Sequence, residues 1–183
     1  MLIARQKKEE NIAEYILYMF QIEDVIRAYH FDVDKIVSEF VEPQLKDTSV
    51  LPEYVNWYSG LIYQMKQRGL ETQGHIDEIK EIIVELSYLH NTLLNMASDD
   101  KYRLTYDRAN SYIEEFKQKS NLKEKNNIEI LFHAMYMKLL LRLQKKDISS
   151  ETEEAFDAMR MVLAYLARSY KRMKSGDMDF LNN

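Results

Sequence analysis

Only four glycines and two prolines interrupt the 183 residues of this chain. Glycine loosens a helix because its backbone is unusually free, and proline breaks one because it lacks a backbone N–H donor. Their scarcity therefore favours long helices joined by short connections. Alternating runs of β-branched residues, which indicate strands, are absent from the sequence, so we predict an all-α fold.

Residues 1–30 contain neither glycine nor proline and predict one long amphipathic helix. Apolar residues recur there at the three- and four-residue spacing that places side chains on one helix face: Ile12, Tyr15, Ile16, Met19, Ile22 and Ile26. A second set at the same spacing is polar, and we call it the polar ladder: Asn11, Glu14, Tyr18 and Gln21. The ladder either faces water or forms a buried network, and the sequence is compatible with both. On another strip, Glu23 and Arg27 have the i, i+4 spacing of an ion pair.

Apolar residues at helical spacing continue along the chain and predict about seven helices. Their expected ranges are 1–30, 32–41, 52–68, 76–97, 99–116, 128–145 and 150–176. The sixth range is apolar almost all round, which is typical of a helix at the centre of a bundle. We expect the first, fourth, sixth and seventh helices to form an antiparallel bundle within one domain, residues 1–176, and a frayed tail at 177–183.

Composition limits the classes of function. The absence of cysteine excludes disulfides, thiolate metal sites and cysteine nucleophiles, and fits a cytoplasmic protein. The longest charge-free stretch of the first helix, residues 15–22, is far shorter than the roughly 20 residues that cross a bilayer.

Residues 1–100 carry 9 Lys and Arg against 18 Asp and Glu, whereas residues 101–183 carry 16 against 12. That basic excess is small for a nucleic-acid-binding protein, so nucleic acid is disfavoured as a partner.

Recognisable catalytic motifs are absent from the sequence. It has no Gly-x-Ser-x-Gly elbow, no glycine-rich phosphate loop, and no Glu-x-x-His pair of the kind that holds a di-iron centre. We therefore predict neither a metal nor a cofactor, and the sequence favours a protein that is not an enzyme.

The polar ladder offers the one candidate ligand site. If Glu14 were buried it would need a polar or charged partner, because an unpaired buried carboxylate destabilises the fold. His90 and His133 fall on inward-facing parts of their predicted helices, so a polar pocket would comprise Glu14, Tyr18, Gln21, His90 and His133. The alternative is that the ladder faces solvent and that each histidine is an ordinary core residue.

The helix expected at 52–68 is rich in aromatic residues. Trp57 and Tyr58 cannot share one narrow stripe, so one of them is expected to extend beyond the core toward a partner. Tyr54, Trp57 and Tyr58 are therefore the candidate interface residues, and a wide buried face is the alternative.

Several segments resemble a known family. The opening MLIARQKKEENIAEYILYM, then QIEDVIRA, and later GHIDEI and ELSYLH are similar to an uncharacterised family of bacterial all-helical proteins of about this length. The resemblance spans essentially the whole chain. It implies a small cytoplasmic bacterial protein of unknown function and identifies no catalytic residues.

These observations lead to two hypotheses of function. The first is a non-enzymatic intracellular interaction or scaffold protein that self-associates or binds another protein, away from the membrane. The second is a small-molecule-binding protein, or an unrecognised enzyme, with a polar pocket inside the bundle.

Overall fold

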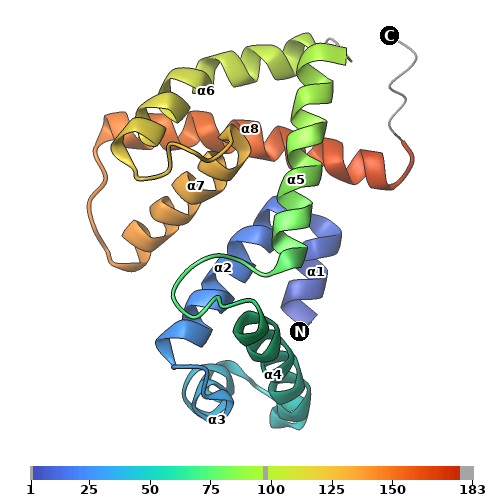
Figure 1. Cartoon of the computed structure of the whole chain (residues 1–183), viewed down its shortest axis with the longest axis vertical. Coiled ribbons are helices and arrows are strands. Elements are labelled where there is room, and N and C mark those ends of the chain that lie inside the picture. The colour runs from blue at the N-terminus through green and yellow to red at the C-terminus, as the bar shows by residue number, and fades with distance from the viewer. Residues whose placement is uncertain (1, 97–98, 178–183) are drawn as a thin grey trace.

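The computed structural model describes residues 2–96 and 99–177, and within these ranges it is helical and has no strand. The prediction of an all-α fold is confirmed. Short 3₁₀ turns at Glu42–Gln44 and Thr48–Val50 and π-helical turns at Ile36–Val41 and Thr92–Met96 extend or link the helices. The α-helices labelled in Figure 1 are α1 (Leu2–Glu10), α2 (Ile12–Ala28), α3 (Val33–Lys35), α4 (Leu51–Gln67), α5 (Asp77–Asn91), α6 (Asp100–Lys119), α7 (Asn127–Leu143) and α8 (Ser150–Lys174).

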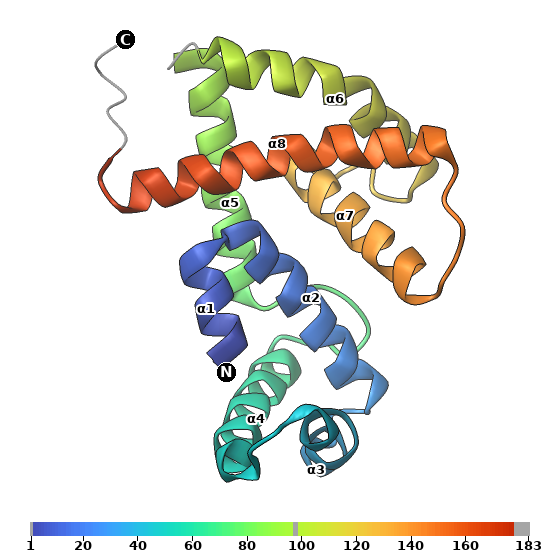
Figure 2. The same cartoon turned by 180° about the vertical axis from the view of Figure 1, so that it is seen from behind.

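The long first helix is divided in two, which is why the described chain has eight α-helices rather than seven. Asn11 has an extended backbone (φ −153°, ψ 103°), and its side chain accepts hydrogen bonds from the N–H groups of Ala13 and Glu14. This is N-cap geometry, which starts α2 and satisfies donors that a helix leaves free at its N-terminus. The prediction of one uninterrupted helix was wrong because Asn11, which also fits the spacing of the polar ladder, ends the helical backbone and caps α2. Figure 2 shows α1 and α2 meeting in an elbow.

The longest helix, α8, runs across the molecule and packs against α2, α5, α6 and α7 (Figures 1 and 2). Tyr102 of α6 lies against Tyr165 of α8, whereas the later Tyr112 contacts the earlier Glu154, so α6 runs antiparallel to α8. α7 is antiparallel to α8 as well, since Lys138 meets Asp157 and the later Arg142 meets the earlier Glu153. α5 crosses α8 instead of following it, and α3 and α4 lie at the opposite end beside α2.

The predicted central helix, α7, is central only along its first half. Five of its early side chains are at most 1% exposed: Ile128, Ile130, Leu131, Phe132 and Ala134. Near its end, Met137 is 46% exposed and Leu143 is 63% exposed, so that part leaves the core. Among the described residues, no helix is both long and apolar enough to span a bilayer. Residues 178–183 of the expected tail lie outside the described residues.

The Asn11 cap gives a first testable prediction. Replacing Asn11 by Ala removes the acceptor for two helix-end N–H groups and should lower the free energy of unfolding by about 1 kcal/mol, measured by urea denaturation. Asn110→Ala, at an exposed position inside α6, is the matched control and should leave stability unchanged or slightly raised. Equal effects of the two substitutions would show that Asn11 does not cap α2.

Candidate functional site

The five residues predicted to form a pocket have separate surroundings. The structure has a cleft between α1, α5 and α8 and a groove between α2, α7 and α8. Glu14 lines the groove, with its side chain 58% exposed and ion-paired at 2.9 Å to Lys7 Nζ, and the other four residues line neither hollow. Tyr18 and Gln21 are half-buried, and Tyr18 lies near Tyr54 and Tyr58. The structure therefore does not bring the five residues together in one pocket.

His90 is a core histidine. Its Nδ1 lies 2.6 Å from the hydroxyl oxygen of Tyr102, and its ring packs against Tyr106 with centroids 4.6 Å apart. Burial lowers the pKa of His90 to about 4, because desolvation disfavours the charged imidazolium. The ring is therefore neutral at physiological pH and stabilises the packing of α5 on α6.

His133 lies elsewhere, on α7 beside Phe20 of α2. The ring centroids of His133 and His75 are 6.1 Å apart, and that of Phe20 lies 6.0 Å from His133. Burial lowers the pKa of His133, and the neighbouring His75 and Lys125 lower it further. His133 thus borders a polar network that the sequence did not reveal.

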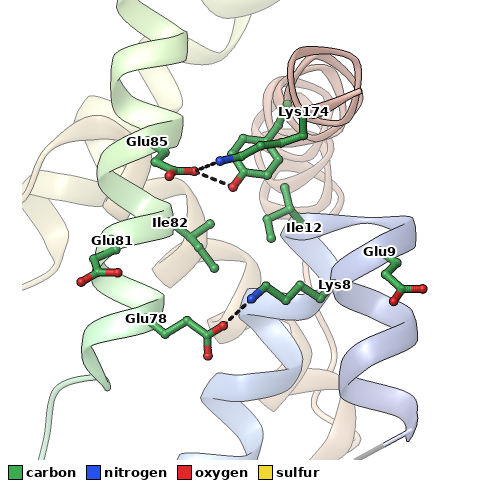
Figure 3. Close-up of a pocket in the computed structure, with 9 residues that line it drawn as sticks. Lys8, Glu9, Ile12, Glu78, Glu81, Ile82, Glu85 and Lys174 are labelled. Atoms are coloured by element: carbon green, nitrogen blue, oxygen red, sulfur yellow. Dashed lines mark hydrogen bonds and ion pairs between the residues drawn. The ribbon is translucent and has the colours of Figure 1, made fainter. Parts of the chain in front are cut away.

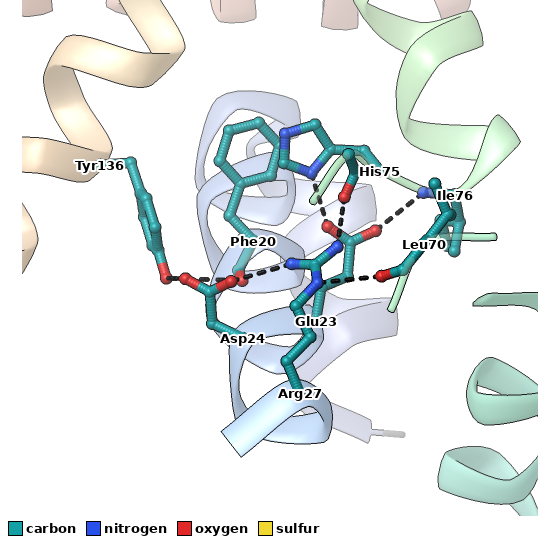
Figure 4. Close-up of polar contacts among 9 residues, drawn as sticks. Phe20, Glu23, Asp24, Arg27, Leu70, His75, Ile76 and Tyr136 are labelled. Carbon is teal, nitrogen blue, oxygen red and sulfur yellow. Dashed lines mark hydrogen bonds and ion pairs between the residues drawn. The ribbon is translucent and has the colours of Figure 1, made fainter. Parts of the chain in front are cut away.

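That network is centred on Glu23, a carboxylate of α2 whose side chain is fully buried. Its Oε2 lies 2.6 Å from His75 Nδ1, and its Oε1 accepts the backbone N–H of Ile76 at 2.8 Å (Figure 4). The His75 ring stacks on Phe20 with centroids 3.7 Å apart and planes within 7°. Among the described residues Glu23 is the one buried carboxylate, and both of its oxygens are bound.

Arg27 and Asp24 extend the network along α2. Arg27 donates from Nε to the carbonyl of Leu70 at 3.1 Å and from Nη2 to the carbonyl of Gly74 (Figure 4). It pairs with Asp24 at 2.9 Å, so the predicted pairing of Arg27 with Glu23 was wrong. The other Asp24 oxygen accepts the Tyr136 hydroxyl at 2.6 Å, which links α2 to α7. The last turns of α2 therefore hold the connection between α4 and α5.

A buried carboxylate that orients an imidazole is also the arrangement of a general base. Such a base needs space for a substrate beside its free nitrogen. His75 is stacked on Phe20, its side chain is 21% exposed, and it lines neither the cleft nor the groove. The geometry therefore supports a structural role for the pair, which fixes the start of α5.

The cleft between α1, α5 and α8 has a volume of about 500 Å³ and acidic walls (Figure 3). Glu78 pairs with Lys8 of α1 at 2.5 Å, and Glu85 pairs with Lys174 of α8 at 2.9 Å and accepts the Tyr170 hydroxyl at 2.5 Å. The bonds from Tyr170 and Lys174 lower the pKa of Glu85, because they stabilise its charged form. These ion pairs join the first and last helices to α5.

The predicted interface residues of α4 are mainly internal. Tyr58 is 1% exposed and cannot contact a partner, while Tyr54 and Trp57 are half-buried and pack against the core. The Trp57 and Tyr58 rings meet edge to face with centroids 5.0 Å apart. Tyr54, Trp57 and Tyr58 therefore belong to a wide buried face of α4, which was the alternative to a partner contact.

The opposite side of α4 has an unexpected composition. Its exposed residues Asn56, Ser59, Gly60 and Tyr63, which we call the α4 outer face, include a tyrosine that is 65% exposed. Gly60 lies inside the helix, and a Cβ added there would meet nothing within 4 Å. Glycine in a helix interior costs roughly 1 kcal/mol relative to alanine. Nothing in the described part of the chain requires a glycine at this position.

A family model matches residues 1–177, a range that includes the Glu23 network, the cleft and α4. Its description is "Domain of unknown function (DUF4924)". The chain belongs to this family. The resemblance to an uncharacterised family is thereby confirmed, and the description of DUF4924 assigns no activity to any of these residues. No curated protein and no solved structure matches the chain.

The Glu23 network predicts a large loss of stability on substitution. Glu23→Ala leaves the Ile76 N–H and the His75 ring without their buried acceptor and should lower the free energy of unfolding by about 3 kcal/mol in denaturant titrations. Glu114→Ala, which removes an exposed carboxylate from α6, should change it by less than about 0.5 kcal/mol. A Glu23→Ala effect as small as that of the control would contradict the network.

The environment of His90 predicts a specific pH dependence. Because its pKa falls to about 4 in the fold from an ordinary value of 6.5, the unfolded chain binds a proton first as the pH drops. The contribution of His90 to stability is therefore complete above pH 6.5 and is lost as the pH falls toward 4. NMR titration of the His90 ring should show a midpoint near 4. A midpoint near 6.5 would show that His90 is accessible to water.

Proposed function

We propose that this chain is a non-enzymatic interaction protein that self-associates, and that two copies meet through the α4 outer face. The observation that carries the proposal is Gly60, an interior helix glycine that costs stability without an intrachain reason. Positions where a sequence departs from local preference without compensation are often functional. A glycine on an exposed helix lets another backbone approach closely, which an Ala or larger side chain would hinder.

The surroundings of Gly60 support a helix-to-helix contact. Tyr63 follows it by three residues, so the two lie on the same face, and tyrosine supplies apolar area together with a polar tip. Within the described chain α4 packs mainly against α2, α3 and the short turns that precede it, at one end of the molecule (Figure 1). A symmetric pair of α4 helices crossing at Gly60 would bring the same surface of each copy together.

The non-enzymatic part of the proposal is supported by the Glu23–His75 pair. Its carboxylate oxygens are used to hold His75 and Ile76, and the stacked imidazole borders neither hollow. A bacterial source and a cytoplasmic location belong to the same proposal, and the cysteine-free composition supports the location.

Light scattering after size-exclusion chromatography tests self-association. The chain should show a mass that rises with concentration toward twice the 21.9 kDa of one copy. Tyr63→Ser should weaken the association at least about tenfold, equivalent to about 1.4 kcal/mol. Tyr88→Ser is the matched control, since Tyr88 is a 71% exposed tyrosine on α5 and its loss should leave the mass unchanged. A strict monomer at all concentrations, or equal effects of the two substitutions, would overturn the proposal.

Substitutions of Gly60 separate the stability of one copy from the association of two. Gly60→Ala should raise the free energy of unfolding, measured on dilute protein, by roughly 0.5–1 kcal/mol because the site is helical and open. Gly60→Leu should abolish association while the far-ultraviolet circular dichroism remains that of the parent chain. If Gly60→Ala destabilised the dilute protein, the glycine would be explained within the chain and the argument would fail.

A further inference from the structure

The groove between α2, α7 and α8 combines an apolar floor with a cationic edge. Its volume is about 300 Å³, at the small end of the range for small-molecule sites. Lys138 and Arg142 of α7 and Arg160 of α8 line one edge, and Glu14 lies at the start of α2. The apolar lining is contributed by all three helices: Ala13, Leu17, Met135, Leu139, Leu163 and Ala164.

The cations at this edge outnumber their carboxylate partners. Lys138 is buried, and its Nζ lies 2.6 Å from Glu153 and 3.2 Å from Asp157. The same two carboxylates also hold Arg142 and Arg160, each at 3.4 Å. Three positive charges thus share two negative ones, and neither Glu153 nor Asp157 lines the groove. The edge that meets the groove therefore has an excess of positive charge.

The two arginines have the chemistry to bind an anion. A guanidinium carries five N–H donors in a planar fork that matches a carboxylate. Arg142 and Arg160 are 62% and 57% exposed, and their contacts at 3.4 Å are long for charged hydrogen bonds. They can therefore turn toward a ligand without losing a buried pair. Lys138 beneath them contributes fixed positive charge, because burial and two carboxylates hold it in place.

The carboxylate that lines the groove is already paired. Glu14 pairs with Lys7 at 2.9 Å, so an incoming anion does not meet an unpaired carboxylate there. We propose that the groove binds an aliphatic carboxylate, with the hydrocarbon chain on the floor and the carboxylate between Arg142 and Arg160. The site uses the polar-ladder residues Asn11 and Glu14 as part of its wall and is independent of the α4 outer face.

Octanoate is a suitable probe, because it combines a single carboxylate with a short apolar chain. Titration into the full chain, followed by ¹H–¹⁵N NMR, should shift resonances of α2, α7 and α8 with a Kd of about 1 mM or tighter. 1-Octanol has a comparable apolar body without the charge and should bind at least about tenfold more weakly. Equal affinity for octanol would overturn the proposal, since the groove would then recognise only apolar surface.

Variants connect binding to the groove. Arg142→Gln combined with Arg160→Gln should weaken octanoate binding at least about tenfold, whereas Arg168→Gln, an exposed α8 position outside the groove, should not. Ala164→Trp fills the groove from an exposed position and should abolish binding with the circular dichroism spectrum retained. Binding that is absent at about 10 mM octanoate, or that is unaffected by these substitutions, would overturn the proposal. Repeating the titration with Tyr63→Ser keeps this result separate from self-association.

Discussion

The buried carboxylate of Glu23 determines where α2 meets the segment that leads into α5. A charge without solvent is costly unless it is paired and hydrogen-bonded, and Glu23 meets that need with the imidazole of His75 and the N–H of Ile76. Both partners immediately precede α5, which begins at Asp77. The position of α5 therefore depends on α2. The cleft that α5 forms with α1 and α8 depends on α2 for the same reason.

The two ends of α2 contact different parts of the molecule. Its last turns, from Phe20 to Arg27, hold the connection between α4 and α5 and reach α7 through Asp24 and Tyr136. Its first turns, from the cap at Asn11 to Leu17, form one wall of the groove. α4 packs on the same helix through its buried face and leaves its outer face uncovered. One helix thus supports both proposed sites while keeping them apart.

The sequence predicted the helices well, because helical periodicity and capping are local properties. It did not predict the polar sites, because their partners are distant in the chain: Glu23 and His75 are 52 residues apart. Gly74, at φ 89°, and His75 lie in the connection before α5, where no helical periodicity indicates which way a side chain faces. Asn11 and Glu14 have the spacing of an N-cap residue and the third residue of a helix, which indicates a new helix starting at Asn11. The same spacing also fits a continuous polar ladder, so the sequence did not decide between the two. Tyr58 could not be placed from spacing alone, since the width of the buried face of α4 depends on α2 and α3.

The central functional claim is that two copies meet at the α4 outer face, and the cysteine-free chain allows a direct test. A single cysteine at the exposed Ser59 lies next to Gly60, whereas one at the exposed Ser111 lies on α6. Disulfide formation under mild oxidation, followed by non-reducing electrophoresis, measures how close each position comes to its counterpart. We predict rapid formation of a covalent dimer for Ser59→Cys and slow formation for Ser111→Cys. Equal rates, or faster cross-linking through Ser111→Cys, would contradict the claim.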